Sequence, residues 1–116
     1  MVKVIIAGGR DFDDHALMKR KLDHLFSKRM PDEIVSGGAR GADALGEDYS
    51  KECGIPLKIF NADWEKRGRA AGHIRNAEMA NYGTHLVAFW DKRSRGTLNM
   101  IETAKKKGLD VRVIYY

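Results

Sequence analysis

Three short segments combine glycine with arginine, serine or threonine, and each lies between an apolar run and the start of a helical pattern. They are Gly8-Gly9-Arg10-Asp11-Phe12, Ser36-Gly37-Gly38-Ala39-Arg40-Gly41-Ala42-Asp43 and Trp90-Asp91-Lys92-Arg93-Ser94-Arg95-Gly96-Thr97. Glycine lets the backbone approach an anion closely and adopt positive φ, and the free amides at the start of the following helix then face that anion. These residue types therefore predict a phosphate-binding site.

Charged and hydroxyl side chains in the same segments would strengthen such a site. Arg10, Arg40 and Arg95 offer guanidinium groups for charge-assisted hydrogen bonds to a phosphate. Ser94 and Thr97 offer hydroxyl donors at the start of a helix. The expected ligand is thus an anion held by both backbone and side chains.

Other candidates have both a binding and a structural interpretation. Asp43, one turn into its predicted helix, is either a partner for a ribose hydroxyl or a surface carboxylate favoured by the helix dipole. Arg75 and Asn76, at the expected start of a helix, either contact the ligand or form a solvated helix end. Trp90 and Trp64 are each candidates for stacking on a base or for packing in the core.

Each glycine pair alone is also typical of a plain tight turn. The second segment lacks the Gly-Lys-Ser/Thr ending of a P-loop, and the first does not follow the Gly-x-Gly-x-x-Gly pattern. The prediction of a phosphate site therefore depends on all three turns meeting at one edge of a sheet, where ligands bind in open α/β folds.

The elements that must position these turns alternate along the chain. Strands are expected over residues 3–7, 33–36, 56–60, 85–90 and 111–115, and helices over about 13–26, 41–52, 74–82 and 96–107. Residues 61–72 are polar, basic and irregular in pattern. The alternation predicts right-handed βαβ units, and hence a Rossmann-like α/β three-layer sandwich with a mainly parallel five-stranded sheet.

The composition suits a single domain over residues 1–116. A net charge of +5 favours anionic ligands. One cysteine, Cys53, excludes an intrachain disulfide, and the four histidines lack metal-ligand spacing, so neither a metal nor a cofactor is expected. No apolar stretch approaches the roughly 18 residues of a membrane span and no signal pattern is visible, so we expect a cytoplasmic protein without membrane contact.

The ordered series of motifs closely resembles the YspA-like, cpYpsA-related branch of the SLOG superfamily, the group that contains the DNA-processing protein DprA and the LOG phosphoribohydrolases. The resemblance covers residues 3–113 and rests on the three segments above together with Ala62-Asp63-Trp64 and residues 72–79 around Arg75-Asn76. It implies a sheet ordered 3-2-1-4-5. It also implies a pocket for a nucleotide or an ADP-ribose-like ligand, with the phosphate near Gly37-Gly38 and Gly96-Thr97.

The chain departs from the LOG pattern at one point. LOG relatives, which hydrolyse the N-glycosidic bond of nucleoside monophosphates, have a glutamate two or three residues after the Gly-Thr pair, where this chain has Asn99 and Met100. Cleavage of a glycosidic bond usually needs a carboxylate, and the next one along the helix is Glu102. Arg75 and Glu102 are therefore the catalytic candidates, and binding without hydrolysis is the leading hypothesis.

Three functions follow, in this order. The first is a sensor or sequestering module for a nucleotide-type small molecule. The second is LOG-like hydrolysis, and the third is DprA-like nucleic-acid binding along a set of basic residues, Arg67, Arg69, Arg75, Lys92, Arg93 and Arg95. A homodimer is left open.

Overall fold

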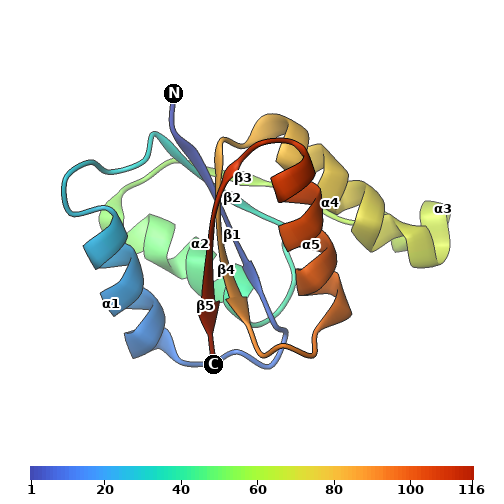
Figure 1. Ribbon diagram of the computed structural model, residues 1–116, viewed down its shortest axis with the longest axis horizontal. Coiled ribbons are helices and arrows are strands. Elements are labelled where there is room, and N and C mark those ends of the chain that lie inside the picture. Colours follow the sequence, from blue (N-terminus) through green and yellow to red (C-terminus); the bar gives the residue numbers. More distant parts are fainter.

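Strands and helices alternate through residues 1–116, all of which the computed structural model describes (Figure 1). The strands are β1 (Lys3–Gly8), β2 (Glu33–Ser36), β3 (Leu57–Ile59), β4 (His85–Trp90) and β5 (Asp110–Tyr115). The helices are α1 (His15–Leu25), α2 (Ala42–Cys53), α3 (Trp64–Arg67), α4 (Ala71–Tyr82) and α5 (Arg95–Lys106), with a 3₁₀ turn (Gly68–Ala70) before α4. None of the helices has the length and apolar character needed to cross a membrane.

The five strands form one parallel sheet in the order β3-β2-β1-β4-β5. Strands β1 and β4 lie side by side at its centre, with Ile5 paired to Leu86 and Ala7 to Ala88. The predicted Rossmann-like α/β architecture and strand order are confirmed.

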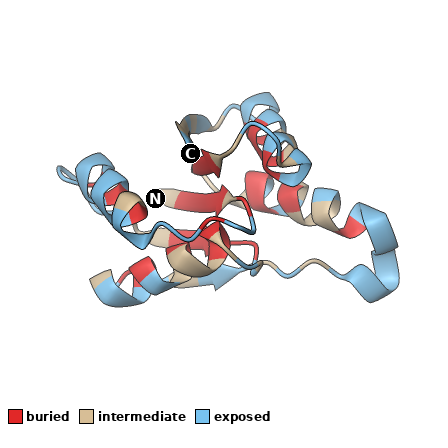
Figure 2. Cartoon of the chain, turned by 90° about the horizontal axis from the view of Figure 1, so that it is seen from below, coloured by how far each residue is buried: buried red, intermediate tan, exposed pale blue.

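Helices cover both faces of the sheet, with α1 and α2 on one side and α4 and α5 on the other (Figure 1). Successive side chains of a strand point to opposite faces, so Ile6 packs under α1 and α2 while Ile5 packs under α4 and α5. Both side chains are fully buried, and each such burial contributes about 1.5–3 kcal/mol. Figure 2 shows the buried residues, in red, along the central strands and the inner sides of the helices. This double burial explains why the central strands are apolar without alternation.

The region between β3 and α4 is more regular than the sequence pattern predicts. Asp63 caps the short helix α3 by accepting a hydrogen bond from the Lys66 amide at 3.1 Å. Helix α4 begins at Ala71, three residues before its predicted start at Ile74. Ala71 is buried and thereby anchors the first turn. As a consequence, Arg75 and Asn76 lie in the second turn of α4, and not at its start.

Candidate functional site

A cavity of about 540 Å³ opens at the carboxyl ends of β1 and β4. The chain leaves β1 toward β2 on one side and leaves β4 toward β5 on the other, so this is the point where the direction of winding reverses. The cavity wall includes many of the residues predicted from sequence: Gly8, Gly9, Arg10, Asp11, Ala39, Asp43, Arg75, Asn76, Ser94, Gly96 and Thr97. Residues from all three glycine-rich segments therefore meet in one place.

The first two segments pack backbone against backbone. The Ala42 amide donates to the Gly9 carbonyl at 3.1 Å, and the Gly9 amide donates to the Phe89 carbonyl at 3.2 Å. Gly41 has φ +74°, and a Cβ on it would lie 2.3 Å from the Gly9 oxygen. Only glycine satisfies both conditions, so Gly41 fixes how the loop after β2 sits on the loop after β1.

Two backbone amides of the loop after β2 already donate hydrogen bonds to side chains of the chain itself. The Gly38 amide donates to Ser36 Oγ at 3.1 Å, and the Ala39 amide donates to Asp43 Oδ2 at 3.3 Å. Ser36 Oγ in turn donates to Glu47 Oε2 at 2.6 Å. The sequence predicts this loop as the clearest phosphate cradle, but its Gly38 and Ala39 amides have acceptors within the fold.

Asp43 is the buried acid of the site, with 5% of its surface exposed. Burial raises the pKa of its carboxyl to about 6, because the charged form loses water; hydrogen bonds from the loop amides and the Arg75 charge oppose this rise. Asp43 therefore faces the loop amides and the cavity, in a position unlike the solvated surface carboxylate considered above.

Arg75 reaches from α4 across the cavity to the loop after β2. Its Nη1 donates to the Gly37 carbonyl at 2.7 Å, and its Nε donates to Asn76 Oδ1 at 3.3 Å. Burial lowers the pKa of the guanidinium, with Asp43 acting in the opposite direction. A Cβ on Gly37 would lie 2.8 Å from the Asp43 carboxylate and 3.0 Å from the Arg75 guanidinium, so glycine is required for this arrangement.

The loop after β4 presents the most open helix start. Asp91 Oδ1 accepts hydrogen bonds from the Arg93 and Ser94 amides, each at 2.8 Å, and Ser94 Oγ accepts one from the Thr97 amide at 3.3 Å. No protein acceptor contacts the amides of Arg95 and Gly96. These two donors at the positive end of α5 are available to an anion.

Asn76 links α4 to α5 beneath this helix start. It is 4% exposed, and its Nδ2 donates to the Gly96 carbonyl at 3.3 Å and to Asn99 Oδ1 at 2.9 Å. With Arg75 bonded to its own oxygen, the Asn76 amide is fully engaged. It therefore acts as a brace that positions Arg75 and the start of α5 relative to each other.

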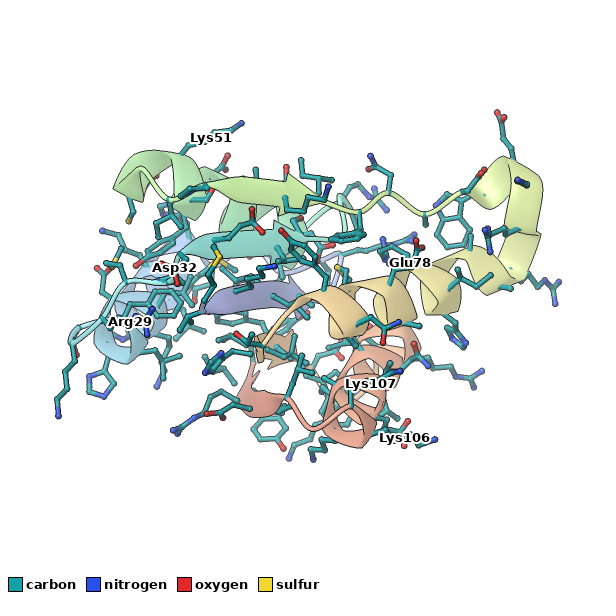
Figure 3. The ribbon with its side chains drawn as sticks, turned by 90° about the horizontal axis from the view of Figure 1, so that it is seen from above. Arg29, Asp32, Lys51, Glu78, Lys106 and Lys107 are labelled. Atoms are coloured by element: carbon teal, nitrogen blue, oxygen red, sulfur yellow. The ribbon has the colours of Figure 1, made fainter.

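The cavity wall carries four arginines, Arg10, Arg69, Arg75 and Arg93. None of them takes part in any of the ion pairs of the structure. Lysines of the solvated helix ends lie elsewhere: Lys51, Lys106 and Lys107 stand where α2 and α5 end, at the opposite edge of the sheet (Figure 3). Asp11, Asp43 and Asp91 also line the cavity, so its wall holds one more arginine than carboxylates, and no ion pair joins the two groups. No cluster of three His, Cys, Asp or Glu side chains arranged to hold a metal ion is present.

A profile of the YspA, cpYpsA-related SLOG family matches residues 2–66, which is more than half of the chain. The chain belongs to this family. The similarity predicted from the motifs is therefore confirmed.

Two sequence relatives and one solved structure are similar to this chain. The Gene 61 protein of Mycobacterium phage D29 is 33% identical over 118 residues, spanning 96% of this chain and 94% of that protein. A B3 domain-containing protein of Arabidopsis thaliana is 30% identical over 86 residues, or 68% of this chain and 53% of that protein. The DNA processing protein A (DprA) of Streptococcus pneumoniae superposes with a TM-score of 0.77 over 97% of this SLOG chain, at 18% identity, and the chain spans half of its length.

Six predicted site residues line neither the main cavity of this SLOG domain nor the hollow beside it, and Gly41, described above, is one of them. Phe12 is buried in the core against Phe89, and Ser36 is buried beneath its own loop. Trp90 packs against Tyr115, and its Nε1 donates to the Ser94 carbonyl, so it shapes the loop after β4 without lining the cavity. Arg95 and Glu102 are exposed on α5 and do not line the cavity. Glu102 lies five residues after Thr97, which places it on a different side of the helix.

The remaining predicted residues, Gly37, Gly38 and Arg40, line a second hollow next to the first. The sequence assigns Arg69 only to the nucleic-acid alternative and places Arg93 in the third glycine-rich segment without a role of its own there. It does not select Met79 or Met100, which also line the main cavity. The two methionines carry no signal of their own, because apolar residues at helical spacing indicate only a core-facing side. Arg69 and Arg93 are in the polar segments where a basic residue is equally typical of solvent exposure.

Proposed function

We propose that the main cavity binds a nucleotide, with its phosphate at the start of α5. One observation carries the proposal: arginines that form no ion pair, together with Gly96 and its open amide at the start of α5, line one cavity at the point where the winding of the sheet reverses. The volume of about 540 Å³ falls in the usual range for small-molecule sites, roughly 300–1,000 Å³. Family membership and the DprA-like fold are consistent with a nucleotide-related role.

In this proposal backbone amides, a hydroxyl group and arginine side chains bind the phosphate together. The amides of Arg95 and Gly96 and the Thr97 hydroxyl bind phosphate oxygens, while Arg75 and Arg93 neutralise their charge. Met79 and Met100 close the floor of the cavity but are each only 1% exposed, whereas the half-exposed Trp64 in the cavity wall offers apolar surface for the sugar or base. The nucleotide is thereby oriented with its phosphate toward α5.

Binding without hydrolysis suits these residues better than LOG-like cleavage. Asn99, which stands where LOG relatives have a glutamate, cannot ionise, and its Oδ1 is bonded to Asn76. Glu102 is exposed and outside the cavity. A sensor or sequestering role, in which the ligand is held and released intact, is the function we propose.

The test is isothermal titration calorimetry with inorganic phosphate, AMP, ADP and ADP-ribose, followed by chromatography of each mixture for released base. Arg75→Ala should weaken nucleotide binding roughly tenfold to hundredfold, because a hydrogen bond to a charged group contributes about 1.5–3 kcal/mol. Lys106→Ala, which removes a cation at the far end of α5, should leave the affinity unchanged. No heat of binding at millimolar nucleotide would contradict the proposal, and release of base would favour hydrolysis.

A second candidate function is the binding of single-stranded nucleic acid. The observation that favours it is a group of exposed residues in the cavity wall, namely Arg10, Trp64, Arg69 and Arg93. Cations combined with an exposed aromatic ring are typical of such surfaces. Fluorescence anisotropy with a labelled oligonucleotide at several salt concentrations tests it: affinity should fall steeply as salt rises, and an absence of binding at low salt would exclude this function.

A further inference from the structure

A second hollow, of about 320 Å³, adjoins the main cavity on the side of the loop after β2. Its own wall consists of Gly37, Gly38, Arg40, Asn61 and Ala62. The two hollows share four residues: Arg10, Ala39, Trp64 and Arg75. They are therefore neighbouring compartments with a common boundary, which we call the seam.

The seam carries positive charge that would attract an anion. Arg10 and Arg75 contribute two cations there, and neither is part of an ion pair. Their charges are close enough that Arg10 adds to the lowering of the Arg75 pKa. The Asp43 carboxylate partly offsets the Arg75 charge without forming an ion pair with it, and a further negative group between the two guanidinium groups would reduce their mutual repulsion.

Trp64 provides an aromatic surface at the same boundary. Half of its surface is exposed, and the Arg10 guanidinium lies 5.9 Å from the centre of its ring. A Cβ on Gly72 would lie 3.4 Å from the edge of that ring, so the indole rests on the first turn of α4. A supported but uncovered tryptophan beside arginines is suited to stacking on a nucleobase.

The second hollow is formed largely by backbone. Gly38 has φ +72°, and a Cβ on it would lie 2.5 Å from Asn61 Oδ1. The loops after β2 and β3 thus close this wall without a side chain at position 38, while Arg40 and Asn61 supply polar groups. The hollow is lined by only three hydrophobic residues of nine, and it offers hydrogen-bond partners for a sugar or base.

We propose that the site takes a ligand with two nucleotide units joined through phosphate, one unit in each hollow and the linking phosphate on the seam between Arg10 and Arg75. This inference rests on the function proposed above and names its substrate class. The linker is a phosphodiester, as in an oligonucleotide, or a pyrophosphate, as in a small dinucleotide; both place negative charge between two nucleosides. With a phosphodiester linker the 5′-phosphate of the first unit stays at the start of α5, whereas with a pyrophosphate linker that unit turns its phosphate to the seam. A mononucleotide fills only the main cavity.

Occupying both hollows should raise the affinity well above that for one unit. Joining two binding units makes the second contact intramolecular, and gains of roughly 10²–10⁴ in affinity are typical where the geometry permits both contacts. Calorimetry should compare AMP with diadenosine diphosphate and with the 5′-phosphorylated dinucleotide pApA. At least one two-unit ligand should bind at least tenfold more tightly than AMP, and the tighter one distinguishes a pyrophosphate-linked source from an oligonucleotide source.

A substitution that fills only the second hollow separates this inference from the proposed function. Ala62→Phe should reduce the affinity for the two-unit ligand to that for AMP, while AMP binding stays unchanged, because Ala62 does not line the main cavity. Ala16→Phe, on the exposed side of α1, controls for a new surface phenylalanine. Thermal unfolding of each variant verifies the fold.

The outcomes are distinct. If AMP binds but neither two-unit ligand binds more tightly, or if Ala62→Phe weakens AMP and the two-unit ligand equally, the two-compartment inference is wrong and the nucleotide site stands. If no nucleotide binds at millimolar concentration, the proposed function fails and the inference with it.

Discussion

The buried acid Asp43 gives a quantitative prediction about stability and pH. Its pKa is about 6 in the folded chain, against a reference value of 3.8. Between these two values the folded state holds a proton that the unfolded state has lost, so stability falls as pH rises through this window. A difference of about two pH units, at about 1.4 kcal/mol per unit, gives a loss of about 3 kcal/mol between pH 4 and pH 6.5.

Asp43→Asn should remove this pH dependence, because an amide does not titrate. Urea unfolding followed by far-ultraviolet circular dichroism at pH 4, 5, 6 and 7 gives the free energy of unfolding of each protein. The native protein should lose about 3 kcal/mol relative to Asp43→Asn as pH rises across this range. Contributions of other carboxyl groups are common to both proteins and cancel in the comparison.

Asp48→Asn is the matched control, since it removes an exposed carboxylate from the same helix. Its stability should follow that of the native protein at every pH. If the curves for Asp43→Asn and the native protein run parallel instead, the carboxylate is not held in a desolvated site, and the reasoning about its burial is wrong.

Other substitutions test the loops that surround the cavity. Gly8→Ala places a Cβ 2.5 Å from the Phe89 carbonyl oxygen, a backbone atom that cannot move aside, so we expect a loss of about 1–3 kcal/mol from overpacking, measured by urea unfolding. Gly96→Ala meets no atom within 4 Å and lies in a helix, so it should be neutral or stabilise by up to about 1 kcal/mol; equal losses for both variants would contradict the packing argument. Ser94→Ala removes the hydroxyl that caps α5, which should lower stability by about 1 kcal/mol and the melting temperature by about 4 °C in a calorimetric scan. An unchanged melting temperature would mean that the cap contributes nothing.

The elements with strong local signals could be predicted from the sequence. Apolar runs ending in glycine located β1 and β2, and Gly54, with φ +66°, ends α2 where its position predicts. The strand order followed from the family resemblance. The short helix α3 escaped prediction because four exposed residues have no apolar periodicity; only Asp63, a typical capping residue, indicated a helix start there.

The site could be predicted by location but not by side-chain direction. A glycine-rich turn at the end of a strand must lie at the carboxyl edge of the sheet, which is why the three segments converge. Whether Trp90 faces the cavity or α5, and whether Asp43 faces solvent or the loop amides, depends on packing between segments far apart in the sequence. The burial of Asp43 arises from Arg75, Gly37 and Ala39 together, and no local pattern encodes it.

The pairing of β1 with β4 determines when, during synthesis of the chain, the sheet can finish folding. Lys3 bonds to Thr84, 81 positions away, so the centre of the sheet closes only after most of the chain exists. Loop closure over such separations slows folding relative to that of helical bundles. The cavity lies between these two strands, and its walls come from opposite halves of the chain. An unfinished chain can form its first βα units during synthesis but has no cavity, so ligand binding marks the completion of folding.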